Sequence, residues 1–297
     1  MSPLQHKIDF AVIFSVTNAN PNGDPLNGNR PRTDYSNFGE VTDVAIKRKI
    51  RDRLLEAWVA NGKQEDGNKI YVQSDDRRTD EYRSLRERFE KELGKDAGGP
   101  KTTELACQRW LDVRAFGQLF ALKATSSKKK ASSKGDDDSD SQGDTGVSIG
   151  IRGPVTVQSA FSVEPIDVSS TQITKSVSGE GDGTKRGPDT MGMKHRVDRG
   201  IYKFFGSMNP QLAEKTKFSD ADAAAIKAVL PKLFENDESS ARPAGSMQVL
   251  TVIWWQHNCK SGQYSSARVH GSLNVKHDGS FELTPLDNLR PECLNGF

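Results

Sequence analysis

The sequence has few cysteines, and none is spaced for a disulfide framework or a metal site. Cys107, Cys259 and Cys293 are odd in number, far apart and without CxxC spacing, which argues against a disulfide-stapled secreted domain and against a structural zinc site. His257 and His270 lie near Cys259 in segments with strand character, but they lack ligand spacing, so we expect packing or surface roles for them. We therefore expect no metal and a reducing cytoplasm.

Long apolar runs and nucleotide-binding loops are also missing. No stretch approaches the length needed to cross a membrane, and no export signal is evident, so we expect no membrane partner. No GxGxxG or P-loop opens a helix, and no cofactor is expected. Net charge is only +2, from 42 basic and 40 acidic residues, so a nucleic-acid partner would require basic residues gathered on one face.

What remains is a polar globular chain. With 34% hydrophobic and 28% charged residues among 297, it can bury a substantial core. Alternating apolar side chains predict a core strand over residues 9–17. Helical spacing begins after Thr42, a suitable N-cap, with an apolar stripe at four-residue steps. Further elements are expected as helices over 104–122 and 219–234 and as strands over 247–255, 265–275 and 280–286.

Three segments interrupt this frame. Residues 61–103 carry alternating charges and predict a peripheral helical insertion. Residues 123–146 contain no aromatic or large aliphatic residue and predict a disordered loop. Residues 170–203 have two β-like arms around a glycine-rich tip and predict a protruding hairpin. The order of elements favours one elaborated α+β domain over 1–297, with a ferredoxin-like βαββαβ core, an antiparallel sheet and large insertions; such sheets often bind RNA.

The loop over residues 18–32, NANPNGDPLNGNRPR, raises the first functional question. Its Asn-x-Asn-x-Asn-Gly spacing resembles the start of a calcium loop, but position twelve is Asn29 instead of a bidentate Glu. An ordinary turn explains the Asn, Gly and Pro content but not the length, since about two dozen residues separate the strand from the next helix. Amides and arginines suit a polyanion instead. The loop residues expected to face it are Asn18, Asn20, Asn22, Arg30 and Arg32.

Two further basic groups accompany this loop. Five basic residues follow Thr42 in a seven-residue window opposite the apolar stripe, which is either an ordinary solvated face or a phosphate-binding one. Met191 and Met193, in the hairpin, are placed to wedge between bases or stack on them. Tyr202, Phe204 and Phe205 are expected in the core. The basic residues are Lys47, Arg48, Lys49, Arg51 and Arg53 in the helix and Lys185, Arg186, Lys194, His195, Arg196, Arg199 and Lys203 in the hairpin.

Several blocks of the sequence together resemble one protein family. They are VTNANPNGDP after the first strand, GPVTVQSAFSVEP, TQIT, DTMGMKHRVDRGIYKFFGSMNP and QYSSARVHGSL. In this order they span nearly the whole chain and resemble the backbone subunit of the type I-C CRISPR surveillance complex, Cascade. Members of that family have an RNA-recognition-motif-like palm, polymerise along one CRISPR RNA, and project a thumb hairpin that kinks the guide at regular intervals.

The resemblance implies a non-catalytic subunit that wraps CRISPR RNA (crRNA) in the cytoplasm of a prokaryote, in antiviral defence. Its partners would be crRNA, the target DNA strand through the guide, other copies of itself and other Cascade subunits, with a recruited helicase-nuclease acting on the complex. The loop and the first helix would line the guide phosphates, and residues 190–199 would return from the thumb. The RNA-binding residues expected are Asn18, Asn20, Asn22, Arg30, Arg32, Lys47, Lys49, Arg53, Met191, Met193, Lys194, His195 and Arg196.

Two alternatives stay open. Related backbone subunits of type III complexes cleave target RNA with an acidic residue in the loop after the first strand, and Asp24 and Asp34 occupy comparable positions here. A lone carboxylate without a base or a metal-ligand partner is, however, a weak catalytic signal. In the second alternative the basic patches serve only self-assembly, and the chain is a structural module.

Overall fold

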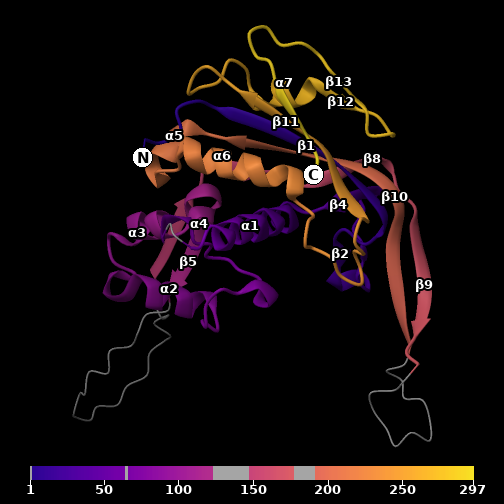
Figure 1. Cartoon of the computed structure of the whole chain (residues 1–297), viewed down its shortest axis with the longest axis horizontal. Helices are drawn as coiled ribbons and strands as arrows, with labels where there is room; N and C mark the ends of the chain where they lie inside the picture. The colour runs from indigo at the N-terminus through magenta and orange to yellow at the C-terminus, as the bar shows by residue number, and fades with distance from the viewer. Residues whose placement is uncertain (1, 64–65, 123–146, 177–190) are drawn as a thin grey trace, which may run out of the picture.

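The computed structural model describes residues 2–63, 66–122, 147–176 and 191–297 (Figure 1). The expected disordered loop over 123–146 and the hairpin tip with Lys185 and Arg186 lie outside these residues. Within the described ranges, no helix is both long and apolar enough to cross a membrane.

An antiparallel sheet of eight strands forms the centre of the described chain (Figure 1). β1 (Ile8–Ala19) lies in its middle and pairs with β10 (Met191–Met208) on one side and with β11 (Met247–Gln256) on the other. The predicted α+β class with an antiparallel sheet is therefore confirmed. The other strands of the sheet are β14 (Glu292–Asn295) beside β11, β7 (Val155–Val157), β8 (Ala160–Pro165) and β9 (Val168–Thr174) beside β10, and β4 (Phe38–Val41) beside β8.

Helices cover one face of this sheet. α1 (Asp43–Ala60) begins after Thr42, the predicted N-cap, and α6 (Asp220–Val229) begins after a capping box at Ser219. α5 (Pro210–Thr216) precedes α6. Apolar side chains of α1 and α6 pack against alternate side chains of β1 and form the main hydrophobic core, because side chains along a strand point to opposite faces in turn.

The C-terminal part of the chain covers the other face. α7 (Ser266–Gly271), β12 (Leu273–Val275) and β13 (Phe281–Leu283) form a second apolar cluster with the remaining side chains of β1 and β11. The prediction of a single strand over 265–275 is wrong, because the Ser265 hydroxyl caps a helical turn there. This segment therefore covers part of the sheet face that such folds often use to bind RNA.

A buried polar cluster fastens the covering segment to the sheet. Asp9 of β1 accepts a hydrogen bond from His257 Nε2 at 2.9 Å, and its carboxylate lies 3.1 Å from Lys7 Nζ and 3.5 Å from His270 Nε2. Burial by itself would raise the pKa of Asp9, but His257, His270, Ser266 and Lys7 together hold that pKa well below its usual range. Both histidines thus have packing roles, as expected, although His270 lies on a helix and not on a strand.

A smaller helical body lies beside the main core, at the lower left of Figure 1. Its buried side chains form a separate apolar cluster around Phe89, Trp110 and Phe120, so the segment has a core of its own. Its elements are η2 (Asp66–Asn68), η3 (Asp75–Arg77), α2 (Leu85–Leu93), η4 (Gly94–Asp96), α3 (Thr102–Arg109), α4 (Leu111–Phe116) and the paired strands β5 (Gly117–Leu122) and β6 (Val147–Arg152).

The predicted helix over 104–122 is wrong in its second half. Trp110 has an extended backbone that separates α3 from α4, and a strand replaces the last turns. Gly117 permits the change of direction, because its φ is 81° and a Cβ there would lie 2.3 Å from the Ile151 carbonyl oxygen. The apolar spacing in this segment is therefore shared between two short helices and a strand.

Two buried ion pairs join the helical body to the main core. Arg114 of α4 forms a bidentate pair with Asp222 of α6, at 2.6 and 2.9 Å. Arg51 of α1 lies 2.9 Å from Asp112, whose carboxylate also accepts the Tyr71 N–H at 2.7 Å. Both junctions use charged side chains that have little contact with solvent. Substituting one partner of either pair by a neutral residue would therefore leave the other charge buried and unpaired.

Cys107 provides a test of the core of the helical body. Burial raises the pKa of its thiol to about 11, whereas Cys259 and Cys293 are exposed. We expect a chromogenic thiol reagent at pH 8 to label two cysteines in the folded protein and the third only after denaturation, because the thiolate is both scarce and shielded. Cys107→Ala should give two labelled thiols in both states; three labelled thiols in the folded wild type would contradict the structure.

Candidate nucleic-acid interface

The asparagine-rich loop is held together by its own amides. It contains β2 (Gly23–Asp24), the 3-10 turn η1 (Pro25–Asn27) and β3 (Arg30–Pro31). Asn20 is buried and donates to the Asn29 carbonyl at 2.7 Å, while Asn22 Oδ1 accepts both the N–H and the hydroxyl of the α1 cap, Thr42, at 3.0 and 2.9 Å. These two amides position the loop on the start of α1.

The third asparagine is different. Asn18 is exposed at the end of β1 with a left-handed backbone, φ 53°, so its amide faces solvent. Because Asn22 uses its oxygen within the loop, the spacing does not assemble a calcium ligand set. No group of three acidic, histidine or cysteine side chains that could hold a metal occurs among the described residues.

Asp24 in the loop and Asp34, two residues after it, also hold the local structure. Asp24 lies 3.2 Å from Arg32 Nη2 and caps η1 through the Leu26 N–H. Asp34 Oδ1 accepts two backbone N–H groups, from Ser36 and Phe38, at 2.8 and 2.9 Å. Local hydrogen bonds of this kind are what Asp residues contribute to turns.

One polar contact ties this loop to the hairpin. Arg30 Nη1 donates to Ser170 Oγ at 2.9 Å and lies 3.5 Å from His195 Nδ1, and Ser170 Oγ is 2.8 Å from the same His195 nitrogen. Figure 1 shows the loop with β2 on the inner side of the hairpin formed by β9 and β10. Arg30 and His195, 165 residues apart in the sequence, therefore belong to one surface.

The hairpin arms project away from the sheet (Figure 1). β9 pairs with residues 191–197 of β10 in an unbroken antiparallel register. Met191 and Met193 are 68% and 55% exposed, as a wedge would require, whereas Tyr202 and Phe204, further along β10, are buried as predicted. Phe205 is half-buried and stacks on His270 with ring centres 4.6 Å apart.

The register divides the hairpin residues between two faces, because directly paired residues point to the same side and neighbours in sequence alternate. The inner face, which Arg30 contacts, carries Met191, Met193 and His195. The outer face carries Lys194 and Arg196. These five residues are adjacent in sequence and were expected to act together, but the register places them on opposite faces of the hairpin.

The basic residues of α1 do not form the open face that the sequence suggested. Lys49 and Arg53 are 3% and 4% exposed. Lys49 is paired with Asp237 and lies over the Phe234 ring, 5.5 Å from its centre, and Arg53 is paired with Glu56. Both side chains are thus buried and paired with acidic residues, so the structure does not offer them to a phosphate as the sequence suggested. The charges serve packing because the segment around 234–242 covers this side of the helix.

The other basic side chains of α1 also have acidic partners. Lys47 lies 2.9 Å from Asp43, and Arg48, the most exposed of them, lies 3.1 Å from Asp237. The Lys47–Asp43 pair is partly exposed and contributes little stability. Asp237 is mostly buried, but 46% of the Arg48 side chain is exposed, so Lys47 and Arg48 both remain accessible to an anion. Arg51 is committed to the helical body, as described above.

A segment that the sequence analysis missed lies beside the loop. The Asn20 N–H donates to the Ala241 carbonyl at 2.9 Å, which places residues 239–246 next to the asparagines. Arg242, in this segment, lies 2.9 Å from Asp237 and is partly exposed. The sequence signal was a single arginine in a Ser-, Pro- and Gly-rich turn, which does not distinguish an interface from an ordinary loop.

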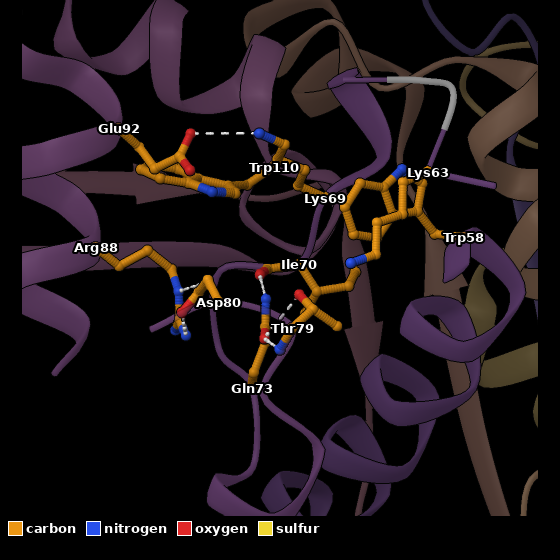
Figure 2. Close-up of a pocket in the computed structure, with 10 residues that line it drawn as sticks. All are labelled: Trp58, Lys63, Lys69, Ile70, Gln73, Thr79, Asp80, Arg88, Glu92 and Trp110. Carbon is orange, nitrogen blue, oxygen red and sulfur yellow. Dashed lines mark hydrogen bonds and ion pairs between the residues drawn. The ribbon is translucent and has the colours of Figure 1, made fainter. Parts of the chain in front are cut away.

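Figure 2 shows a cavity of about 300 Å³ between the last turn of α1 and the helical body. Trp58 and Trp110 line it on two sides. Its polar side chains are largely engaged with each other: Arg88 pairs with Asp80 at 2.8 and 2.9 Å, and Gln73 donates to a backbone carbonyl at 2.7 Å. The cavity lies at the opposite end of α1 from the asparagine-rich loop. Because its polar side chains already have partners, we read it as a gap in the packing between α1 and the helical body and not as a ligand site.

The sequence matches one known protein family over almost its whole length. A model of the family described as CRISPR-associated protein Cas7 matches residues 6–290. The chain belongs to the Cas7 family. A curated relative, the CRISPR-associated protein Cas7 of Haloferax volcanii, is 25% identical over 287 residues, which cover 94% of this chain and 78% of the relative.

The comparison with solved structures found chains from two RNA-guided complexes, both with TM-scores below 0.5. A chain of a "CRISPR RNA-guided surveillance complex, pre-nicking" is 15% identical, with a TM-score of 0.46, over 84% of this chain and 78% of that one. A chain of a second "CRISPR RNA-guided surveillance complex" is also 15% identical, with a TM-score of 0.43, over 84% of this chain and 68% of that one.

The buried Lys49 should make the free energy of unfolding depend on pH in a way that can be tested. Burial lowers the pKa of this ammonium to about 8, although Asp237 opposes the shift. Between pH 8 and about 10.5 the unfolded chain therefore binds a proton that the folded chain has released, so the free energy of unfolding rises with pH in this window. Cys107, whose pKa is raised to about 11, acts in the opposite direction above about pH 9.

We therefore expect Cys107→Ala to gain stability relative to Cys107→Ala/Lys49→Met as pH rises. The difference in free energy of unfolding should grow by about 2 kcal/mol between pH 7.5 and 9.5, measured by urea denaturation. The shared Cys107→Ala change removes the thiol contribution, and the remaining groups cancel in the difference. A difference that does not change with pH would show that Asp237 keeps Lys49 charged throughout.

Proposed function

We propose that this chain is the backbone subunit of a CRISPR surveillance complex and oligomerises along the crRNA. Membership in the Cas7 family supports the assignment, and the type I-C Cascade is the subtype that the sequence blocks favour. In this proposal each copy holds a stretch of guide and presents it for pairing with a target DNA strand. Other Cascade subunits complete the particle, and a recruited helicase-nuclease acts on it.

The observation that carries this proposal is the contact between the asparagine-rich loop and the hairpin. Arg30, Ser170 and His195 meet within hydrogen-bonding distance, so that loop and hairpin form one surface with exposed amide, cationic and apolar groups. Phosphate contacts use such cations and amides, and apolar wedges separate bases. The residues proposed to touch RNA are Asn18, Arg30, Arg32, Met191, Met193 and His195, with Asn20 and Asn22 positioning the loop.

The topology supports an RNA-recognition-motif-like palm. The inner strands of the sheet run in the order β11-β1-β10-β8, all antiparallel, with α1 following β1 and α6 lying between β10 and β11 in the sequence. That arrangement matches a βαββαβ core with insertions. Because α7, β12 and β13 cover part of the open face, RNA in this proposal lies at the edge formed by loop and hairpin and not across the sheet.

A non-catalytic role is part of the proposal. Asp24 accepts a hydrogen bond within the loop and pairs with Arg32, and Asp34 accepts two from the turn that follows the loop. Neither is joined to a histidine or to a second carboxylate, as general acid–base or metal-assisted cleavage would require. The chain would hold RNA without consuming it, and base pairing would supply sequence choice, as in other RNA-guided systems.

The first experiment is to purify the protein from cells with and without a CRISPR array. We expect guide-length RNA in an elongated particle only when the array is present. Arg30→Gln/Arg32→Gln should bind single-stranded RNA about tenfold more weakly, and the slope of log K against log salt should fall by about 1.4, or 0.7 for each lost phosphate contact.

Lys215→Gln/Lys217→Asn is the matched control, because it removes two exposed charges from the region of α5, far from the loop; Asn suits the left-handed backbone of Lys217, φ 63°. Binding by the control should equal that of wild type. A monomer that ignores RNA at low salt would overturn the proposal. Cleavage of bound RNA that is abolished in Asp24→Asn would support the endoribonuclease alternative instead.

A further inference from the structure

An apolar groove lies where α1, α6 and the helical body meet. Its volume is about 490 Å³, compared with about 300 Å³ for the cavity in Figure 2. None of the described residues that line it is charged. Apart from two asparagine amides the lining is apolar, and it includes Leu54, Ala57 and Trp58 of α1, Leu111 of α4, and Ala225 and Ala228 of α6. A groove of this composition suits an apolar side chain and offers nothing to a phosphate.

An apolar side chain projects at the other end of α1. Leu26, in the turn η1, is 98% exposed, so it contacts almost nothing in its own chain. Single exposed apolar residues are ordinary, but this one is held in a fixed place. Its N–H donates to the Asp24 carboxylate, the Asn29 N–H closes the turn on the Asp24 carbonyl at 2.8 Å, and Asn22 joins the loop to Thr42 at the start of α1.

Leu26 and the groove lie too far apart to meet within one chain. α1 has 18 residues and is therefore about 27 Å long, with the loop at its start and the groove along its last two turns. Figure 1 shows β2 of the loop near one end of α1 and α4 near the other. A contact between two different surfaces of identical chains can repeat from copy to copy, and it builds an open chain when it does not close into a ring.

We infer that Leu26 of one copy packs into this groove on the next copy along the RNA. The inference rests on the proposed function, because a single leucine buries far less surface than the roughly 1,000 Å² that a stable interface needs. Copies bound to one RNA meet at an effective concentration on the order of millimolar, at which such a weak contact forms. A soluble partner would lack this advantage, so a second copy is the occupant that fits.

The test measures loading of the full-length protein, by gel mobility shift, on a single-stranded RNA that holds one copy and on one that holds several. Leu26→Ser removes the apolar side chain, and Ala228→Glu places a charge in the groove at an exposed position of α6. Both variants should bind the short RNA within twofold of wild type. On the long RNA, the preference for binding beside an occupied site should fall about tenfold.

Two matched variants control for the chemical changes themselves. Leu119→Ser removes a leucine that is 63% exposed on β5. Ala221→Glu adds a charge to an exposed position of α6, about 10 Å before Ala228 along the helix. Neither residue lines the groove, so both controls should load the long RNA as wild type does. Circular dichroism of all four variants should match wild type, because each substituted side chain is exposed.

An equimolar mixture of Leu26→Ser and Ala228→Glu gives the sharpest readout. The first variant keeps its groove and the second keeps its leucine, so one copy of each can join. Such a pair has a defective surface at both free ends and cannot extend. We therefore expect pairs on the long RNA from the mixture, single copies from either variant alone, and long arrays from wild type.

Other results would overturn the inference in distinguishable ways. Cooperative loading by Leu26→Ser equal to that of wild type would overturn it and leave the proposed function intact. Weaker binding of Leu26→Ser to the short RNA would place this leucine on the RNA and not in a neighbour. Failure of wild type to bind either RNA would overturn the proposed function and the inference with it.

Discussion

The pairing of β1 with β10 is the interaction on which the rest of the structure depends. β10 is 18 residues long, about 60 Å of extended chain. Its second half pairs with β1 inside the core, where Tyr202, Phe204 and Met208 are buried, and its first half pairs with β9 in the projecting hairpin. The exposed hairpin is therefore the continuation of a core strand, and the burial of that strand supports it.

This continuity decides what the hairpin can do. A two-stranded ribbon without support is only marginally stable in water. Here, however, one strand of the hairpin, β10, continues into the sheet, where it pairs with β1 on one side and with β7 and β8 on the other. The contact between Arg30, Ser170 and His195 adds a second attachment near the base. The methionines on one face and the cations on the other are consequently held at fixed positions relative to the loop, as a binding surface requires.

Charge is used in two ways in this protein. Most of the basic residues of α1, together with Arg114, are buried or paired at the junctions between the sheet, the helical body and the segment around Asp237. Pairs of this kind specify which elements meet, but they add little net stability because desolvation offsets the attraction. The cations that these junctions do not use include those of the loop and the hairpin, together with Lys47 and Arg48 of α1. They lie in local groups on the surface, and the net charge of the whole chain is only +2.

Short-range pattern was enough to predict much of the fold. The strand around Phe14, the helix after Thr42 and the arms of the hairpin follow from side-chain periodicity and capping, which act over a few residues. The burial of Tyr202 followed from the aromatic character of its side chain.

Long-range packing decided the rest. Lys49 and Arg53 look solvated in sequence but are buried; for Lys49 the deciding partner is Asp237, 188 residues further along the chain. The helix expected over 104–122 turns into a strand because β6 is there to pair with it. The two faces of the hairpin exist only once β9 fixes the register. In each case the contact is made with a segment that is separate in sequence. Local propensity acts over a few residues and carries no information about which distant segment will pack there.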